Sequence, residues 1–237
     1  MWLIPVLLST HVHDTSELER WWNGKDGYGA APVFAHVQYS SWLGNEKKII
    51  QSWRHAWLQS FAKRHTLAGS HVMEYGIGGG LLAELLLLKY NISSYIGVDI
   101  ANRSLLTTRQ RLQKLAISHW KLLHTPQEFH GHGTDIFISL AVIQHFPSKN
   151  YTDAFFQNIE RSRIPVVLLQ VKEAQRAQFL DVDAGSSFDK HKYDSMVTHA
   201  TRVNTRYILR HLTSYVIAWK SDLMPHSQIV YEFALVV

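Results

Sequence analysis

The sequence predicts an α/β protein with a mostly parallel sheet covered by helices on both faces. Three observations support this fold class. Short apolar runs typical of strands alternate with helical patterns along most of the chain. A glycine-rich turn joins the first of these runs to a leucine-rich helix. Two apolar runs close the chain, and their proximity indicates a hairpin that adds an antiparallel strand to the sheet.

Composition limits the classes of protein that fit. The chain has 237 residues, 46% of them hydrophobic, so we expect one domain over residues 1–237. The absence of cysteine excludes disulfides and thiolate metal sites and agrees with a cytoplasmic location. No stretch is apolar enough to span a bilayer, and the opening MWLIPVLLST lacks the flanks of a signal peptide. The net charge of +5 is spread along the chain, which makes a nucleic-acid partner unlikely.

The elements follow in order along the chain. Residues 1–45 are aromatic, glycine-rich and irregular, and a helical pattern begins at Glu46 and continues to Phe61. We expect strands at 71–76, 94–100, 120–124, 135–142 and 164–172, and helices at 81–90, 102–117, 150–162 and 205–212. The runs YVIAWKS and IVYEFALVV form the expected hairpin, with a turn around Pro225. Residues 46–237 therefore form the predicted core.

The stretch from Glu74 to Gly80 reads EYGIGGG, between a strand and a helix. Such a turn places helix amides beside a ligand that approaches the bare backbone. A phosphate-binding P-loop would need Gly-Lys-Ser/Thr at the helix start, but Gly80 is followed by leucine. A dinucleotide motif G-x-G-x-x-G lacks its third glycine, because that position is Leu81. A third pattern, an acid followed by one residue and then G-x-G-x-G, is matched at every position from Glu74 to Gly80.

These residues resemble the class I S-adenosylmethionine-dependent methyltransferases, which have a Rossmann-like, doubly wound sheet. The first motif of that family looks like MEYGIGGG. Its second strand ends in an acid that binds the ribose, and YIGVD places Asp99 there. The run DIFISLAVIQHF is similar to its fourth-strand motif. The resemblance covers residues 46–237 and implies S-adenosylmethionine as the cofactor.

The resemblance also implies which residues bind the cofactor. They are Glu74, Gly76, Gly78, Gly80, Asp99, Ile100, Thr125 and Leu140. Thr125 stands where the family often has an acid for the adenine amino group, and Gln127 or Glu128 are alternatives. Two structural alternatives stay open: Asp99 as a cap of the next helix, and Glu74 as an acceptor for turn amides.

His145 follows the fourth expected strand, at the edge where ligands bind in parallel sheets. It is a candidate general base, but a residue that orders its loop is the favoured interpretation, because no orienting acid is identifiable. We predict no metal site. His11, His13 and Asp14, or His130 and His132, have ligand character, but nothing marks the further ligands that a metal needs.

Two segments are candidates for contact with the methyl acceptor. Residues 1–45 are predicted to cap the cofactor pocket, with Tyr39 and Trp42 as acceptor contacts, since aromatic faces attract cations. Residues 173–200 are long, polar and irregular, and they follow the fifth strand. Such a segment is typical of an acceptor-binding loop, with Tyr193 as the first candidate and His191 and Asp189 beside it.

The sequence therefore predicts methyl transfer from S-adenosylmethionine to an acceptor, for which a small molecule is favoured. A protein or RNA acceptor is the alternative within the same enzyme class. A nicotinamide-dependent oxidoreductase, or a Rossmann module that binds a nucleotide without catalysis, is the alternative from other classes. The residue patterns do not identify the acceptor atom.

Overall fold

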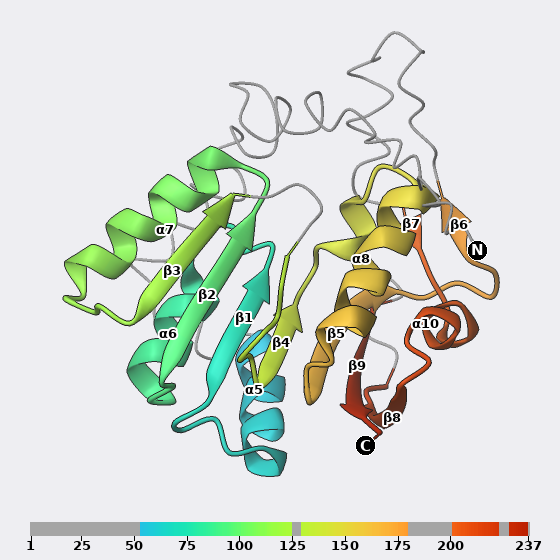
Figure 1. Cartoon of the computed structure of the whole chain (residues 1–237), viewed down its shortest axis with the longest axis horizontal. Helices are drawn as coiled ribbons and strands as arrows, with labels where there is room; N and C mark the ends of the chain where they lie inside the picture. Colours follow the sequence, from blue (N-terminus) through green and yellow to red (C-terminus); the bar gives the residue numbers. More distant parts are fainter. Residues whose placement is uncertain (1–52, 125–128, 180–200, 223–227, 237) are drawn as a thin grey trace, which may run out of the picture.

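The computed structural model of the protein describes residues 53–124, 129–179, 201–222 and 228–236. Its centre is a seven-stranded sheet in the order β3-β2-β1-β4-β5-β9-β8 (Figure 1). The strands are β1 (His71–Tyr75), β2 (Ser94–Asp99), β3 (Trp120–His124), β4 (Ile136–Ser139), β5 (Val166–Lys172), β8 (Tyr215–Lys220) and β9 (Gln228–Leu235). The strands β1 to β5 run parallel, whereas β9 is antiparallel to both β5 and β8. The predicted α/β class and the C-terminal hairpin are confirmed.

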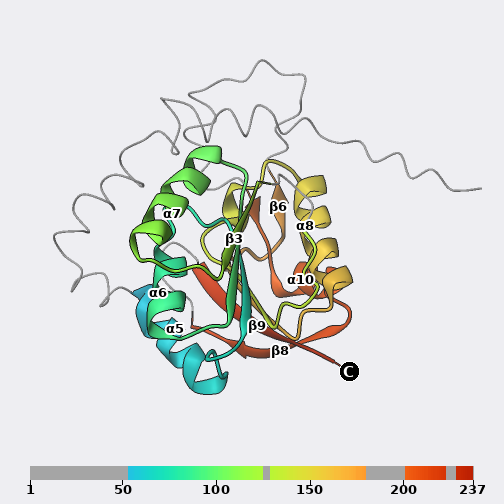
Figure 2. The same ribbon diagram turned by 60° about the vertical axis from the view of Figure 1, so that its left-hand side comes forward.

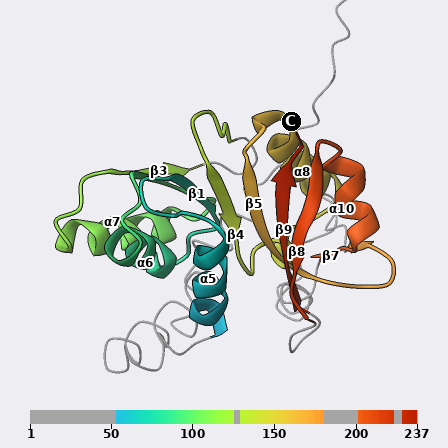
Figure 3. The same ribbon diagram turned by 90° about the horizontal axis from the view of Figure 1, so that it is seen from below.

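Helices cover both faces of the sheet, as Figures 2 and 3 show. The helices α5 (Trp53–Arg64), α6 (Leu81–Lys89) and α7 (Asn102–Lys114) lie on one face, and α8 (Lys149–Ser162) and α10 (Thr205–His211) lie on the other. A central strand is therefore buried on both sides: Val72 of β1 packs in the cluster under the first group of helices, and Met73 packs under the second. This burial explains why β4 has no polar alternation.

Most boundaries lie within two residues of the expected ones, but the ends of β4 and α7 come three residues early. The strand β4 ends at Ser139, because Ala141 has a positive φ of 58° and Ile143–His145 form a 3-10 turn, η1. The helix α7 ends at Lys114, and Ala116 beyond it has a φ of 54°. A left-handed residue interrupts regular structure, and nothing in the sequence marks an alanine for that role. The structure also adds a pair of two-residue strands, β6 (Gln178–Phe179) and β7 (Thr201–Arg202).

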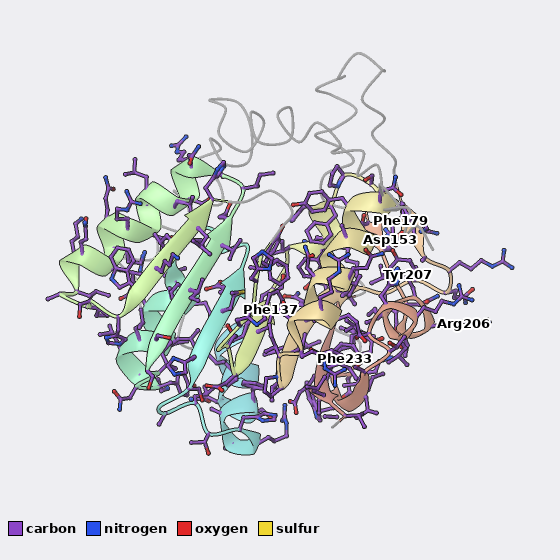
Figure 4. All side chains as sticks on the ribbon, viewed as in Figure 1. Phe137, Asp153, Phe179, Arg206, Tyr207 and Phe233 are labelled. Atoms are coloured by element: carbon purple, nitrogen blue, oxygen red, sulfur yellow. The ribbon has the colours of Figure 1, made fainter. Side chains whose placement is uncertain are left out.

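Polar contacts join helices to the sheet and to each other. The Glu232 side chain in β9 is 3% exposed, and its carboxylate lies 2.7 Å from both Arg64 Nη2 and His65 Nε2 at the end of α5. On the opposite face, Asp153 of α8 accepts a hydrogen bond from the hydroxyl of Tyr207 in α10 (Figure 4). Among the described helices, none is long and apolar enough to cross a membrane.

Candidate functional site

The carboxyl ends of the parallel strands meet at one edge of the sheet, at the top of Figure 1. The strand order reverses at β1: the chain moves outward to β2 and β3, and then returns to the other side of β1 as β4. In open parallel sheets, a reversal of this kind creates a crevice in which ligands bind. The turns after β1, β2 and β4 therefore form the candidate site.

The turn after β1 needs its glycines for different reasons. Gly76, Gly78 and Gly80 have φ values of 81°, 52° and 74°, which residues with a side chain rarely adopt. A Cβ at Gly76 would lie 2.2 Å from a methyl carbon of Val142, and one at Gly80 would lie 2.7 Å from Thr108. A Cβ at Gly78 would meet no atom of the described residues within 4 Å. Gly76 and Gly80 therefore permit close packing, whereas Gly78 borders open space.

Asp99 ends β2 and joins two turns. Its Oδ2 accepts a hydrogen bond from the amide of Gly78 at 3.0 Å, and its Oδ1 accepts one from the amide of Ala101 at 2.8 Å. The N-cap residue of α7 is Ala101, so Asp99 is not itself the cap. Burial raises the pKa of the Asp99 carboxyl to about 6, although the amide hydrogen bonds and His124 act in the opposite direction.

Glu74 lies in β1, beneath the glycine turn, and is 5% exposed. Its carboxylate accepts a hydrogen bond of 2.5 Å from the hydroxyl of Tyr95, which is fully buried in β2. Burial and the neighbouring carboxylate raise the pKa of Tyr95 well above its ordinary value, so the hydroxyl keeps the proton that it donates. This contact gives Glu74 a structural role, and its predicted contact with the cofactor stays a proposal.

The turn after β4 carries His145. The amide of His145 donates to the carbonyl of Val142 at 2.8 Å, and its ring Nε2 lies 3.2 Å from Nε2 of Gln144. The side chain of Val142 occupies the position that a Cβ at Gly76 would need. The short helix with His145 and the glycine turn are therefore packed against each other.

Two other predicted cofactor contacts lie at strand ends. Ile100 directly follows β2 and is half-buried. Leu140 directly follows β4, is also half-buried, and packs against the cluster under α5, α6 and α7. The structure thus brings Ile100 and Leu140 to the same edge as the glycine turn.

Sequence patterns missed two side chains that hold this site together. The ring Nε2 of His124, the last residue of β3, lies 2.8 Å from the carbonyl oxygen of Ile100. The hydroxyl of Thr108 in α7 donates to the carbonyl of Gly78 at 3.2 Å. The end of a predicted strand is a signal that could have marked His124. No sequence signal marks Thr108, because its role comes from the way α7 packs on the glycine turn.

The other predicted contacts lie outside the described residues. They are Tyr39, Trp42, Thr125, Gln127, Glu128, Asp189, His191 and Tyr193, together with His11, His13 and Asp14. Among the residues that the structure describes, no group of three or more histidine, aspartate or glutamate side chains could hold a metal ion. The rings of His130 and His132 stack with their centroids 6.5 Å apart.

The described residues fit S-adenosylmethionine at two points. The open space at Gly78 allows a ligand to approach the backbone of the turn. Each oxygen of the Asp99 carboxylate can accept more than one hydrogen bond, and the amides of Gly78 and Ala101 occupy one position on each. The carboxylate therefore retains accepting capacity for the hydroxyls of a ribose.

Residues 73–171 match the profile of a family described as a methyltransferase domain. The matched residues extend from β1 to β5, so they include the glycine turn, Asp99 and the turn after β4. A comparison with curated protein sequences finds no match.

The fold is similar to those of solved methyltransferases. The N-methyltransferase NodS from Bradyrhizobium japonicum, solved with S-adenosylhomocysteine, is 12% identical; the match covers 94% of this chain and 98% of that one, with a TM-score of 0.57. A phosphoethanolamine N-methyltransferase from Haemonchus contortus is 17% identical, with 78% and 53% covered and a TM-score of 0.58. The small RNA methyltransferase HEN1 is 17% identical, with 74% and 24% covered and a TM-score of 0.53. At these identities the likeness is one of fold.

We expect Gly78→Arg to abolish binding of S-adenosylhomocysteine in a protein that stays folded, because the new side chain fills the open space beside the turn. Calorimetric titration measures the binding, and thermal unfolding measures the stability. Gly133→Arg is the matched control. Gly133 also has a positive φ, of 75°, and open space around it, but it precedes β4 at the opposite edge of the sheet.

Both substitutions should cost about 1–2 kcal/mol in backbone strain, and only Gly78→Arg should lose the ligand. Equal affinity for S-adenosylhomocysteine in Gly78→Arg and the parent protein would remove the glycine turn from the cofactor site.

Proposed function

We propose that the protein transfers a methyl group from S-adenosylmethionine to a small-molecule acceptor at the carboxyl edge of the sheet, because residues 73–171 match a methyltransferase domain. The observation that carries this proposal is that the open space at Gly78 lies beside the Asp99 carboxylate, next to the point where the strand order reverses between β1 and β4. The donor and the acceptor would meet there, above the ends of β1 and β4.

In this proposal each segment has a task. Residues 46–237 form the core, and residues 1–45 cap the cofactor. The cofactor contacts are Glu74, Gly76, Gly78, Gly80, Asp99, Ile100, Thr125 and Leu140, and the acceptor contacts are Tyr39, Trp42 and Tyr193. Gly78 leaves room for the donor, and Asp99 fixes its ribose by charge-assisted hydrogen bonds, which are stronger than neutral ones.

The chemistry asks little of the protein beyond placement. When bound, S-adenosylmethionine would supply an electrophilic methyl group on a positively charged sulfur. The acceptor lone pair would bond to the methyl carbon as the carbon–sulfur bond breaks, and S-adenosylhomocysteine would leave as a neutral thioether. The site must hold the acceptor atom opposite the sulfur and exclude water. Water would weaken the electrostatic contacts in the site and compete with the acceptor for the methyl group. A hydroxyl acceptor also needs a base to take its proton, whereas an unprotonated amine does not.

The match to NodS over nearly the whole length of both chains supports a small acceptor. The chain corresponds to 98% of NodS, which is described as an N-methyltransferase, and to 24% of HEN1, which is described as a small RNA methyltransferase. Three-quarters of HEN1 therefore has no counterpart in the matched region. The fold that this chain has in common with HEN1 also occurs in the phosphoethanolamine N-methyltransferase, whose acceptor is a small molecule.

An RNA acceptor is the second candidate, and the surface charge favours it. None of the carboxylates between residues 58 and 124 is exposed, because Glu74 and Asp99 are buried and Glu84 pairs with Arg111. The exposed charged side chains in this range are all cationic, and they include Lys63, Lys89, Arg103, Arg109, Lys114 and Lys121. Such a surface attracts phosphates without reading a sequence.

The acceptor class can be tested with a radioactive methyl donor. The purified protein is incubated with methyl-labelled S-adenosylmethionine and either the low-molecular-weight fraction or the total RNA of a cell extract. We expect label to enter the small-molecule fraction, and the Gly78→Arg variant provides the background. Label that appears only in RNA would contradict a small acceptor and support the second candidate.

We expect His145→Ala to weaken cofactor binding and lower thermal stability, because the turn with His145 packs on Gly76 through Val142. Turnover should then recover at saturating cofactor. If His145 is instead a general base, the same change should cut turnover by about 10²–10⁴-fold with cofactor affinity unchanged. Steady-state kinetics at several cofactor concentrations separate the two outcomes, and His145→Gln serves as the conservative variant.

A further inference from the structure

The strand β3 ends in a histidine that contacts the predicted cofactor segment. His124 is in register with Asp99 on the neighbouring strand β2. Within the described residues this pair is the last of the ladder, and the chain of β2 turns into α7 through Ile100 and Ala101. The ring Nε2 of His124 lies 2.8 Å from the carbonyl oxygen of Ile100. A side chain therefore continues the connection between the two strands where the backbone pairing ends.

The chemistry of this contact fixes the state of one ring nitrogen. A carbonyl oxygen can only accept a hydrogen bond, so Nε2 must carry a proton. That proton is present both in the neutral tautomer that makes this bond and in the doubly protonated ring, so the bond to Ile100 persists in both states. The contact holds the backbone between Asp99 and Ala101, whose amide is one of the two donors to the Asp99 carboxylate.

Four described side chains interact electrostatically with the Asp99 carboxylate. They are Tyr75 of β1, Tyr95 of β2, Tyr151 of α8 and His124 of β3, and the interaction with His124 lowers the pKa of this carboxyl. Burial raises the pKa of all three tyrosines, so they stay neutral near pH 7. The first turns after β1 and β2 contribute the Gly78 and Ala101 amides.

We propose that His124 is a positioning residue for the cofactor: its ring holds the Ile100 carbonyl and so keeps the Asp99 carboxylate aligned for the ribose. This inference rests on the proposed function, because it takes Asp99 as the ribose ligand. It assigns to the end of β3 a role in cofactor binding that acts through β2 rather than by contact with the chemistry of methyl transfer.

The proposal makes affinity for the cofactor depend on pH. The ionised Asp99 carboxylate accepts the ribose hydroxyls, and its pKa in the cofactor-free protein is about 6. Affinity should therefore fall as the pH drops through this value. A nearby cation lowers the pKa of a carboxyl, so removing His124 should move the midpoint of this loss to higher pH. The exposure of His124 to solvent screens the interaction, and a shift of less than one pH unit is expected.

The test is calorimetric titration with S-adenosylhomocysteine between pH 5 and 8, with thermal unfolding of each variant. At pH 7.5, His124→Phe should weaken binding by about 2–10-fold, which corresponds to one hydrogen bond. His124→Gln can donate to Ile100 but carries no charge, so it should restore much of the affinity and retain the raised midpoint. His119→Phe is the matched control, because His119 is an exposed histidine at the opposite end of β3 and should leave binding unchanged.

Each outcome decides the matter. Binding by His124→Phe that equals the parent at every pH, with a change only in thermal stability, would overturn the positioning role. If His124→Phe does not fold, the midpoint for His124→Gln decides: a midpoint equal to that of the parent overturns the predicted interaction of His124 with Asp99. Failure of the parent itself to bind S-adenosylhomocysteine would instead contradict the proposed function, so the two failures are distinguishable.

Discussion

The carboxylate of Asp99 links the two turns on which the candidate site depends. One oxygen accepts the amide of Gly78 and the other accepts the amide of Ala101, so a single side chain sets the glycine turn against the start of α7. Burial of this charge is unfavourable, as the pKa of about 6 indicates, and the amide hydrogen bonds offset part of that penalty. An acid in this position serves the fold by joining the turns, and its remaining lone pairs are available to a ligand.

Packing against two neighbouring side chains shapes the glycine turn. Val142 fills the space above Gly76, and Thr108 fills the space beside Gly80. These contacts fix the turn between the loop after β4 and the helix α7, and they leave Gly78 as the position with free space on its outer side. The same contacts connect the turn with His145 to the cofactor side of the crevice. A change at one of these positions is therefore expected to affect cofactor affinity and stability together.

Much of the fold could be predicted because two-sided burial leaves a clear pattern. Apolar runs give the strands, and β3 has the bounds expected for it, at residues 120–124. The predicted ends of β4 and α7 were wrong because Ala141 and Ala116 adopt positive φ, and an alanine in the sequence gives no sign of that conformation. The strands β6 and β7 have two residues each, too few for a periodic pattern. In the site, the family resemblance points to Asp99, Gly76 and Gly78, whereas the contacts of His124 and Thr108 depend on the register of β3 and the packing of α7.

Binding of S-adenosylhomocysteine to the parent protein and to Asp99→Asn tests the central claim most directly, with NAD as the competing ligand. The account predicts that the parent binds S-adenosylhomocysteine in preference to NAD. It also predicts that Asp99→Asn weakens that binding by about 1.5–3 kcal/mol, because an amide offers one acceptor oxygen where the carboxylate offers two. Preferential binding of NAD would contradict the account, and so would an Asp99→Asn variant that binds S-adenosylhomocysteine like the parent and differs only in thermal stability.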